Sequence, residues 1–342
     1  MSDAGVNLYS DTQTRPSAGM RAAMAAAEVG DEQRGQDPTV NELQRRVAEL
    51  LGHEAGLFLP SGTMCNQIAF RLHVRPGGDE VYLHRSAHPV VAEAAGAAAL
   101  SGAMLWPLDG EGGMFGGAEL EAALRDPADR HQPRSRLVAV EQTTNMGGGR
   151  VWPRGRVEEV LAVAARHGLR THLDGARLLN ATVASGEAPA TFAAGFDTAW
   201  LDFSKGLGAP VGACLVGSAE LIEEAWRYKQ MLGGAMRQAG IVAAAALWAL
   251  DHNVERLAED HANARALADA LAEIDGVGIE PETVETNLVY FEVADPDRLV
   301  ADLAADGIEM VNLDGRIRAV THLDVDRADV ERAAAAVARL LS

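Results

Sequence analysis

The chain has 342 residues, of which 48% are hydrophobic, and a formal net charge of −19 at pH 7. This length exceeds one ordinary domain, so we expect a large domain and a smaller one. The negative charge argues against nucleic acid and anionic membranes as partners. No stretch approaches the ~18 apolar residues of a membrane span, Met1–Gly5 lacks a signal-peptide pattern, and two cysteines, Cys65 and Cys214, suit a reducing compartment. A cytoplasmic enzyme is the expectation.

The N-terminal part begins with residues 1–37, which are polar and rich in turn formers and predict a loop or arm. Asp37–Gly52 then has a helix start with proline at its first position, an apolar stripe and a terminal glycine. Leu57–Leu59 is a short apolar run, after which Ser61-Gly62-Thr63 opens a helix to Leu72. Free N–H groups, two hydroxyls and the helix dipole suit an anion such as phosphate there. Taken alone, the motif is better explained as an ordinary helix cap.

From residue 79 onward, short apolar runs alternate with helical patterns. The predicted strands are Glu80–Leu83, Met104–Pro107, Leu137–Glu141, Arg170–Asp174, Thr198–Phe203 and Ala213–Val216. The predicted helices between them are Val90–Leu100, Glu119–Arg125, Arg156–His167 and Leu178–Ser185. This alternation predicts an α/β fold with a mostly parallel sheet covered by helices. Ligands of such sheets bind beyond the C-terminal ends of strands, where Glu141, Asp174 and Lys205 lie.

The C-terminal part has a different pattern. A long helical region, about 240–274, is followed by predicted strands at 286–293, 307–311 and 316–322 and helices at 296–305 and 326–341. These elements predict a small α+β domain. We therefore expect an N-terminal arm and large domain over residues 1–254, and a small C-terminal domain over 255–342.

Lysine is rare in this chain, which has 30 Lys and Arg residues but only two lysines, Lys205 and Lys229. A lysine kept after an apolar run and before a glycine-rich turn indicates that an amine is needed. Arginine does not lose its proton, whereas a desolvated lysine can act as a nucleophile and form a Schiff base. The alternative for either lysine is a plain surface cation, and Lys229, on a predicted helix, fits that alternative well.

Asp174, at the end of the strand before Lys205, indicates a specific use for that amine. Pyridoxal phosphate is an electron sink only while its ring nitrogen stays protonated, and a buried Asp supplies the counter-charge. Lys205 would bind the cofactor aldehyde and Ser61-Gly62-Thr63 its phosphate. His88 could stack on the ring, although a loop histidine is more often simply hydrogen-bonded.

Three arginines are candidates for anionic groups. A forked guanidinium binds a carboxylate through two hydrogen bonds, so Arg177 and Arg318 are candidates for the substrate α-carboxylate. Arg237 precedes a predicted helix start and could reach a phosphate. Each of them, taken separately, is better explained as a surface or salt-bridge arginine.

Several short stretches, from about residue 8 to the C-terminus, match one known family. They are Ser10–Thr12, Gly35–Asn41, Pro60–Met64, His88, Ala94–Ala98, Asn145 with Gly147-Gly148, Leu173–Leu178, Ser204–Gly212, Met231–Gly240 and Val320–Asp324. On these stretches the chain resembles the low-specificity L-threonine aldolases of the β-eliminating lyase group. The resemblance implies a pyridoxal phosphate enzyme of the aspartate-aminotransferase-like fold, fold type I.

The resemblance also implies residue roles. Lys205 would form the Schiff base, Asp174 would pair with the ring nitrogen, and His88 would take part in catalysis at the cofactor. The family's α-carboxylate binders match Ser10, Arg177 and Arg318, with Arg177 also close to the cofactor. Arg237 matches a phosphate contact that reaches a neighbouring subunit's site. The family is usually a homotetramer, a dimer of dimers whose paired subunits share active sites.

Three places depart from the family pattern, one of which is Pro89-Val90 after His88, where the family commonly has a bulky or aromatic residue. Thr144 stands where the family has a histidine near the substrate β-hydroxyl, and Arg34 stands where it has a tyrosine near the active site. We therefore expect a changed substrate side-chain pocket, with Thr144 and Arg34 as candidate contacts, beside an intact cofactor machinery. The alternative for Arg34 is that it points to solvent, and the base for the β-hydroxyl would be His88, a group near Lys205 or a bound water. We predict no metal ligands.

The predicted reaction is cleavage of a β-hydroxy-α-amino acid, similar to threonine or allo-threonine, to glycine and an aldehyde. An alternative is β-elimination or racemisation, which needs a base only at Cα, and Lys205 suffices for that. A non-catalytic protein that has kept the fold is the third hypothesis, and it places no chemical demand on Lys205 and Asp174.

Overall fold

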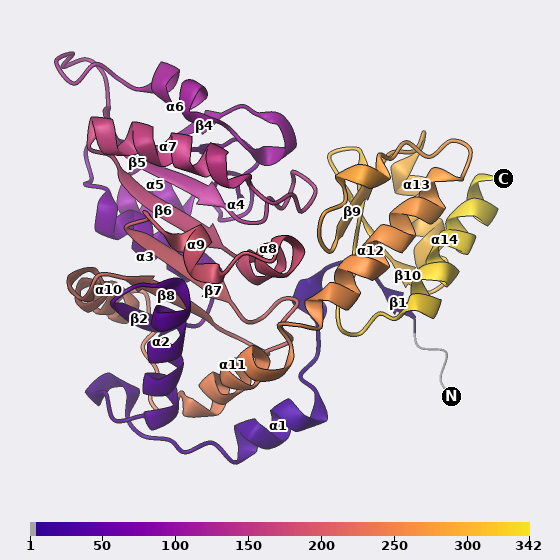
Figure 1. Ribbon diagram of the computed structural model, residues 1–342, viewed down its shortest axis with the longest axis horizontal. Coiled ribbons are helices and arrows are strands. Elements are labelled where there is room, and N and C mark those ends of the chain that lie inside the picture. The colour runs from indigo at the N-terminus through magenta and orange to yellow at the C-terminus, as the bar shows by residue number, and fades with distance from the viewer. Residues whose placement is uncertain (1–4) are drawn as a thin grey trace.

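The computed structural model describes residues 5–342, and Figure 1 shows a large part built on one sheet beside a small part that carries the C-terminus. Met1–Ala4, on which the expectation of no signal peptide rests, lie outside the described residues. Of the helices formed by residues 5–342, none is both long enough and apolar enough to cross a membrane.

The large sheet of the described chain has the strand order β2-β8-β7-β6-β5-β3-β4. The strands are β2 (Ala55–Leu59), β3 (Asp79–His84), β4 (Met104–Leu108), β5 (Arg134–Glu141), β6 (Arg170–Gly175), β7 (Thr198–Asp202) and β8 (Ala213–Gly217). Strands β4, β3, β5, β6 and β7 are parallel, and β8 runs antiparallel to both of its neighbours. The predicted mostly parallel sheet is confirmed, and the C-terminal ends of β5, β6 and β7 meet at one edge.

Helices cover both faces of this sheet. They are α2 (Pro38–Leu51), α3 (Gly62–His73), α4 (His88–Val91), α5 (Gly96–Ser101), α6 (Gly117–Ala123), α7 (Arg154–His167), α8 (Leu178–Ser185), α9 (Pro189–Ala193), α10 (Ala219–Met231) and α11 (Gly240–His252), with short 3-10 turns η1 (Asp11–Gln13), η2 (Glu32–Arg34) and η3 (Glu111–Gly113). Phe58 of β2 packs in the core that includes α2, α7 and α11, whereas Leu57 and Leu59 pack against α3 and α10. Successive residues of a strand face opposite sides, so a strand buried on both faces must be apolar throughout.

The small part has a three-stranded antiparallel sheet, β11-β12-β9, in the described residues. Its elements are α12 (Leu257–Ala272), η4 (Pro281–Thr283), β9 (Leu288–Phe291), α13 (Pro296–Ala305), β10 (Ile308–Glu309), β11 (Val311–Leu313), β12 (Arg316–Val320) and α14 (Arg327–Leu341). The N-terminal strand β1 (Val6–Asn7) pairs with β10, and Leu8 is buried in the small part's core. Residues 1–254 and 255–342 remain our proposed domains, with this N-terminal segment packed in the smaller one.

One stretch differs from the prediction, and a second divides into two elements. The segment 1–37, expected to be a loop or arm, contains helix α1 (Ala18–Ala25). A side chain at Gly19 would collide with the Trp248 ring of α11, so glycine permits this close packing. The long helical region expected over about 240–274 consists of two helices, α11 and α12, and between them the Asn253 side chain donates to the Leu207 carbonyl at 2.7 Å.

Lys229 also differs from the prediction. It fits a surface cation in the sequence, but its side chain is completely buried and its amine donates to Glu32 in η2. Glu32 also accepts from the Met236 N–H at 2.8 Å, and the Lys229 amine lies 4.5 Å from the centre of the Trp226 ring. Burial lowers the pKa of Lys229, and the Glu32 carboxylate opposes that shift. The prediction was wrong because the partner lies 197 residues away in the sequence.

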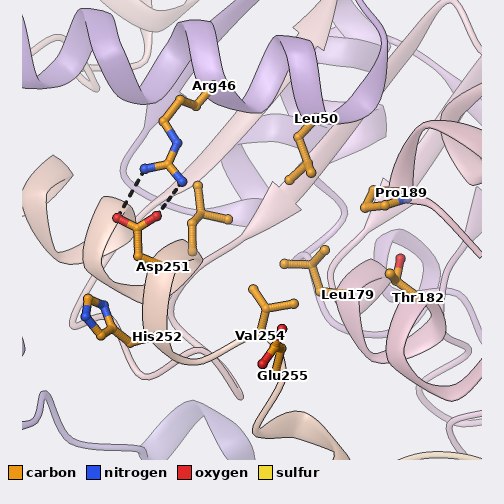
Figure 2. Close-up of a pocket in the computed structure, with 10 residues that line it drawn as sticks. Arg46, Leu50, Leu179, Thr182, Pro189, Asp251, His252, Val254 and Glu255 are labelled. Carbon is orange, nitrogen blue, oxygen red and sulfur yellow. Dashed lines mark hydrogen bonds and ion pairs between the residues drawn. The ribbon is translucent and has the colours of Figure 1, made fainter. Parts of the chain in front are cut away.

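A cavity of about 450 Å³ lies between α2, α8 and α11. Figure 2 shows Leu50, Leu179 and Val254 facing its interior. Arg46 and Asp251 border it through an ion pair whose Nη2–Oδ1 distance is 2.5 Å. Its lining includes none of the predicted site residues.

We expect Glu32→Ala to lower the free energy of unfolding by about 3–5 kcal/mol, because it leaves the Lys229 amine buried without its carboxylate partner. Urea unfolding followed by circular dichroism measures this loss. Glu42→Ala is the matched control, since it removes a partner of the exposed Arg45 and should barely move the midpoint. A Glu32→Ala midpoint as high as that of the control would show that the buried pair contributes little.

Candidate active site

A cleft of about 580 Å³ lies at the C-terminal ends of β5, β6 and β7, between the large part, the N-terminal arm and the small part. The predicted site residues that line it are Ser10, Ser61, Gly62, Thr63, His88, Asp174, Arg177, Lys205 and Arg318. Ser10 comes from the arm, Arg318 from β12, and the others from the large part. The cleft has the size of a site for a small molecule or a cofactor.

Three predicted residues do not line this cleft. Arg34 is exposed at the end of η2. Arg237 is mostly exposed and pairs with Asp31 at 3.0 Å. Thr144 is buried, and its hydroxyl accepts from the Arg150 N–H at 3.2 Å. Within one chain, neither Arg34 nor Thr144 lines the cleft.

Lys205 stands in a tight turn after β7. Its carbonyl accepts from Thr14 Oγ1 at 2.8 Å and from the Gly208 N–H at 2.9 Å, which ties the turn to the arm. Gly208 has φ 76°, a left-handed conformation that favours glycine. The Lys205 side chain reaches the cleft, with 19% of its surface exposed, and its amine contacts the Asp202 carboxylate.

Asp174 lies buried at the end of β6. Its Oδ1 accepts from the Ala176 N–H at 3.1 Å and its Oδ2 from Asn66 Nδ2 at 2.8 Å. Burial raises the pKa of Asp174, although the Asn66 hydrogen bond and the charges of His88 and Lys205 oppose the shift. A buried carboxylate of this kind is stabilised by a cation placed beside it.

Glu141 ends β5 directly beside Asp174 in the parallel pair. Its Oε2 accepts from the His88 N–H at 3.1 Å and its Oε1 from the Asn145 N–H at 3.0 Å. Burial, followed by the neighbouring charge of Asp174, raises the pKa of Glu141 to about 7. A cation beside these two buried carboxylates would stabilise their charged forms, and a protonated ring nitrogen is such a cation.

Asn66, on α3, organises the polar groups behind Asp174. The Trp200 indole N–H can only donate, and its hydrogen bond at 2.8 Å identifies the Asn66 side-chain oxygen. His172 Nε2 therefore donates to the same oxygen at 3.0 Å, and His172 Nδ1 accepts from Thr198 Oγ1 at 2.8 Å. Burial lowers the pKa of His172 to about 3, so the ring stays neutral. The Asn66 nitrogen is then left to donate to carboxylates.

Glu93 is the second carboxylate that Asn66 binds, at 2.7 Å. It is buried, accepts from Gln67 Nε2 at 2.5 Å, and receives His88 Nδ1 at 2.8 Å. The hydrogen bond that His88 donates to Glu93 raises the pKa of His88, while burial opposes the shift. His88, at the cleft wall, is thus oriented by a carboxylate that Asn66 and Gln67 hold in place.

The chain breaks its helix to place Glu93 inward. The helix expected over 90–100 is two short helices, α4 and α5, and Ala94 and Ala95 between them have positive φ values of 49° and 59°. Non-glycine residues adopt this conformation only where surrounding contacts hold them. The hydrogen bonds of Glu93 supply such contacts, and no local pattern in the sequence predicts them.

Arg177 forms a buried pair with Asp11 of the arm. Its Nε and Nη2 donate to the two Asp11 oxygens at 2.7 Å each, and Asn287 of the small part donates to Asp11 at 3.1 Å. Burial raises the pKa of Asp11, but the Arg177 guanidinium outweighs it and holds that pKa well below its usual range. Asp11 occupies the Nε and Nη2 edge of the Arg177 guanidinium, so a ligand would be bound by the other N–H groups of this side chain.

Arg318 is the second guanidinium of the cleft. Its Nη1 donates to Asn145 Oδ1 at 3.2 Å and its Nη2 to the Tyr9 carbonyl at 3.1 Å. Its Nε is buried and has no hydrogen-bond partner among residues 5–342. A buried cationic N–H without a partner suits a carboxylate ligand.

The turn at the start of α3 has the features of an anion site. Ser61 caps the helix, its Oγ accepting from the Met64 N–H at 3.2 Å, and a side chain at Gly62 would collide with the Trp200 ring. Together with Lys205 and Asp174, this turn fits pyridoxal phosphate, because an amine, a carboxylate and a helix N-terminus line one cleft. In the part of the chain that the structure describes, no group of three His, Cys, Asp or Glu could hold a metal ion.

Asp11, Asn66, Glu93 and Asp202 were missed by sequence reasoning as site residues. Asp202 had a local signal, because it stands three positions before Lys205. Asp11 lies within the Ser10–Thr12 match. Asn66 and Glu93 had none, since their importance depends on partners 108 and 27 residues away.

We expect Glu93→Gln to lower the pKa of His88, because an amide replaces the carboxylate that stabilises the imidazolium. The native pKa of His88 is raised above its ordinary 6.5, so this pair stabilises the fold fully below about pH 6.5 and loses that effect as pH rises through the raised value. Glu93→Gln should flatten that part of the stability curve. NMR titration of the His88 ring measures the pKa.

The matched control for this prediction is Glu121→Gln, which removes the carboxylate beside the exposed His167. It should leave the His88 titration unchanged. An unaltered His88 titration in Glu93→Gln would show that Glu93 does not set the charge of this ring.

Comparison with known proteins connects this cleft to a family. The model of the family described as beta-eliminating lyase matches residues 7–295. The probable low-specificity L-threonine aldolase 2 of Arabidopsis thaliana is 40% identical over 335 residues, which cover 95% of this chain and 94% of that protein. A threonine aldolase structure from Leishmania major superposes with a TM-score of 0.84 at 22% identity, over 98% of this chain and 100% of the other. A structure of SPT with PLP has a TM-score of 0.74 at 17% identity, over 98% and 87%.

Proposed function

The chain belongs to the beta-eliminating lyase family, to which its low-specificity L-threonine aldolase relatives point as well, and from this premise we propose that it is a pyridoxal phosphate-dependent aldolase. It cleaves a β-hydroxy-α-amino acid to glycine and an aldehyde. The observation that carries the proposal is the meeting of Lys205 and Asp174 in one cleft with Arg318, whose Nε has no partner among the described residues.

Each part of the cleft has a task in this reaction. Pyridoxal phosphate, when bound, supplies the electron sink for the pair that the broken Cα–Cβ bond leaves. Lys205 would hold its aldehyde carbon, Asp174 its ring nitrogen, and Ser61-Gly62-Thr63 its phosphate. Arg318, Ser10 and Arg177 would fix the substrate α-carboxylate and so orient the bond to be broken.

The base for the β-hydroxyl is the point at which this chain differs from the family pattern. Thr144 is buried away from the cleft, so it does not replace the missing histidine. We assign the task to His88, which lines the cleft and receives its orientation from Glu93. His88 would take the hydroxyl proton while the Cα–Cβ bond breaks and the carbonyl of the aldehyde forms.

We also propose a homotetramer of cytoplasmic subunits with shared sites. Arg34 and Arg237 are exposed and stand outside the cleft of their own chain, so their predicted roles require a partner's cleft. In that arrangement Arg237 reaches the partner's phosphate site and Arg34 the partner's substrate side chain. Two buried free cysteines, Cys65 and Cys214, suit a reducing compartment.

β-Elimination or racemisation is the second candidate, and the missing histidine favours it. Neither reaction needs a base at the β-hydroxyl, and Lys205 can remove the α-proton. Glycine distinguishes the reactions, since only aldol cleavage forms it.

We expect the purified protein to absorb near ~410–430 nm through the cofactor bound to Lys205, and Lys205→Ala to lose that band. We also expect glycine and an aldehyde from at least one of threonine, allo-threonine and phenylserine, measured by chromatography. Keto acid or inverted amino acid without glycine would instead support the second candidate. A band that persists in Lys205→Ala would refute the assignment of this lysine.

A further inference from the structure

Asp202, the last residue of β7, touches the amine on which the proposed function depends. It is buried, with 6% of its surface exposed, and lines the same cleft as Lys205. Its two oxygens have separate partners. Oδ1 accepts from the Ser204 N–H at 2.9 Å and from Ser204 Oγ at 2.8 Å, while Oδ2 contacts the Lys205 amine. One oxygen therefore builds the turn, and the other is left for the amine.

Other charged groups face Lys205 from the neighbouring elements. The charge of Lys205 acts to lower the pKa of Asp11 in the arm and of Asp174 in β6, although neither carboxylate is in direct contact with the amine as Asp202 is. Asp11 is already paired with Arg177, and Asp174 is held by Asn66 and the Ala176 N–H. Arg318, His88 and Glu141 line the rest of the cleft. Of these groups, Asp202 is the one that forms an ion pair with Lys205.

We propose that Asp202 is a positioning residue for the Lys205 amine, which it holds as an ammonium group against the Trp200 side of the cleft whenever the amine is not covalently engaged. A carboxylate in direct contact favours the charged form of an amine and lowers the fraction of uncharged amine available for attack. The Trp200 ring, whose centre lies 5.6 Å from the amine, flanks it.

This inference rests on the proposed function for its consequence. When a substrate amine displaced Lys205 from the cofactor, the carbon–nitrogen double bond to the lysine would break as one to the substrate nitrogen formed. Two protons would pass from the substrate ammonium to the lysine nitrogen, which would leave as an ammonium group. Asp202 stabilises the ammonium group thus formed and slows its return. The carboxylate therefore favours the substrate-bound enzyme and keeps a proton donor beside the reacting carbon.

The composition of the chain makes Lys205 unusually easy to measure. It is one of only two lysines, and the other, Lys229, is completely buried. Acylation of the folded full-length chain, after removal of the cofactor, therefore reports on Lys205, and peptide mass spectrometry separates it from the N-terminal amine. Only an uncharged amine reacts, and any labelling of Lys229 reveals unfolding.

We expect Asp202→Asn to increase the acylation rate of Lys205 at about pH 7.5 by roughly tenfold. The asparagine oxygen can still accept from Ser204, so the turn is kept while the charge is removed. Ser204→Ala is the matched control, because it removes the hydroxyl contact and leaves the ion pair, and its rate should stay within about twofold of wild type. A change of less than about twofold in Asp202→Asn would overturn the proposal.

A second pH separates charge from access to the reagent. At about pH 11, where lysine amines lose their proton, the wild-type and Asp202→Asn rates should converge. A tenfold difference that persists there would mean that the substitution opened the cleft, which would also overturn the proposal.

The cofactor provides an independent measurement. On addition of pyridoxal phosphate, the band near ~410–430 nm should form faster in Asp202→Asn than in wild type by a similar factor, and equal rates would contradict the role of Asp202. Failure of the band to form in wild type would refute the proposed function, whereas the acylation rates would still decide the role of Asp202.

Discussion

The buried ion pair of Asp11 and Arg177 is the interaction on which the rest of the site depends. It joins the arm to the end of β6, and Asn287 brings the small part to the same carboxylate. An ion pair removed from water is stable only when its geometry and hydrogen bonds are nearly complete. The same contacts therefore join the three parts that enclose the cleft, which Ser10 lines from the arm and Arg318 from the small part.

Around that pair the cleft has an unusual excess of buried carboxylates. Asp174, Glu141 and Glu93 lie within one hydrogen-bonded region, and Asn66 donates to two of them. Their mutual repulsion is offset by His88, Lys205 and backbone N–H groups, and a cationic cofactor ring would offset it further. The buried carboxylates therefore favour a positively charged ligand group in the cleft. Arg177 and Arg318, in contrast, favour a carboxylate beside them.

The sequence predicted the parts of this structure that follow local rules. The strands of the large sheet follow from apolar runs, and Lys205 and Asp174 could be located because strand ends carry functional residues in parallel sheets. Lys229 was misassigned and Asn66 was missed because their partners lie far away in the sequence. Arg34 and Arg237 belong to a third case, since within one chain both are exposed and stand outside the cleft. Contacts between residues far apart in the sequence determine the features that local sequence patterns do not predict.

The pairing of β1 with β10 has a consequence for how the chain acquires its structure. Val6 and Leu8 belong to a core otherwise built from residues after 257, so the small part is a discontinuous folding unit. During synthesis β1 emerges long before its partner and stays unpaired until Ile308 has left the ribosome. Contacts of such long sequence separation are the slow ones in folding. The arm, which follows directly after β1 and lines the cleft, is thus assembled only after the strands of the small part have been made.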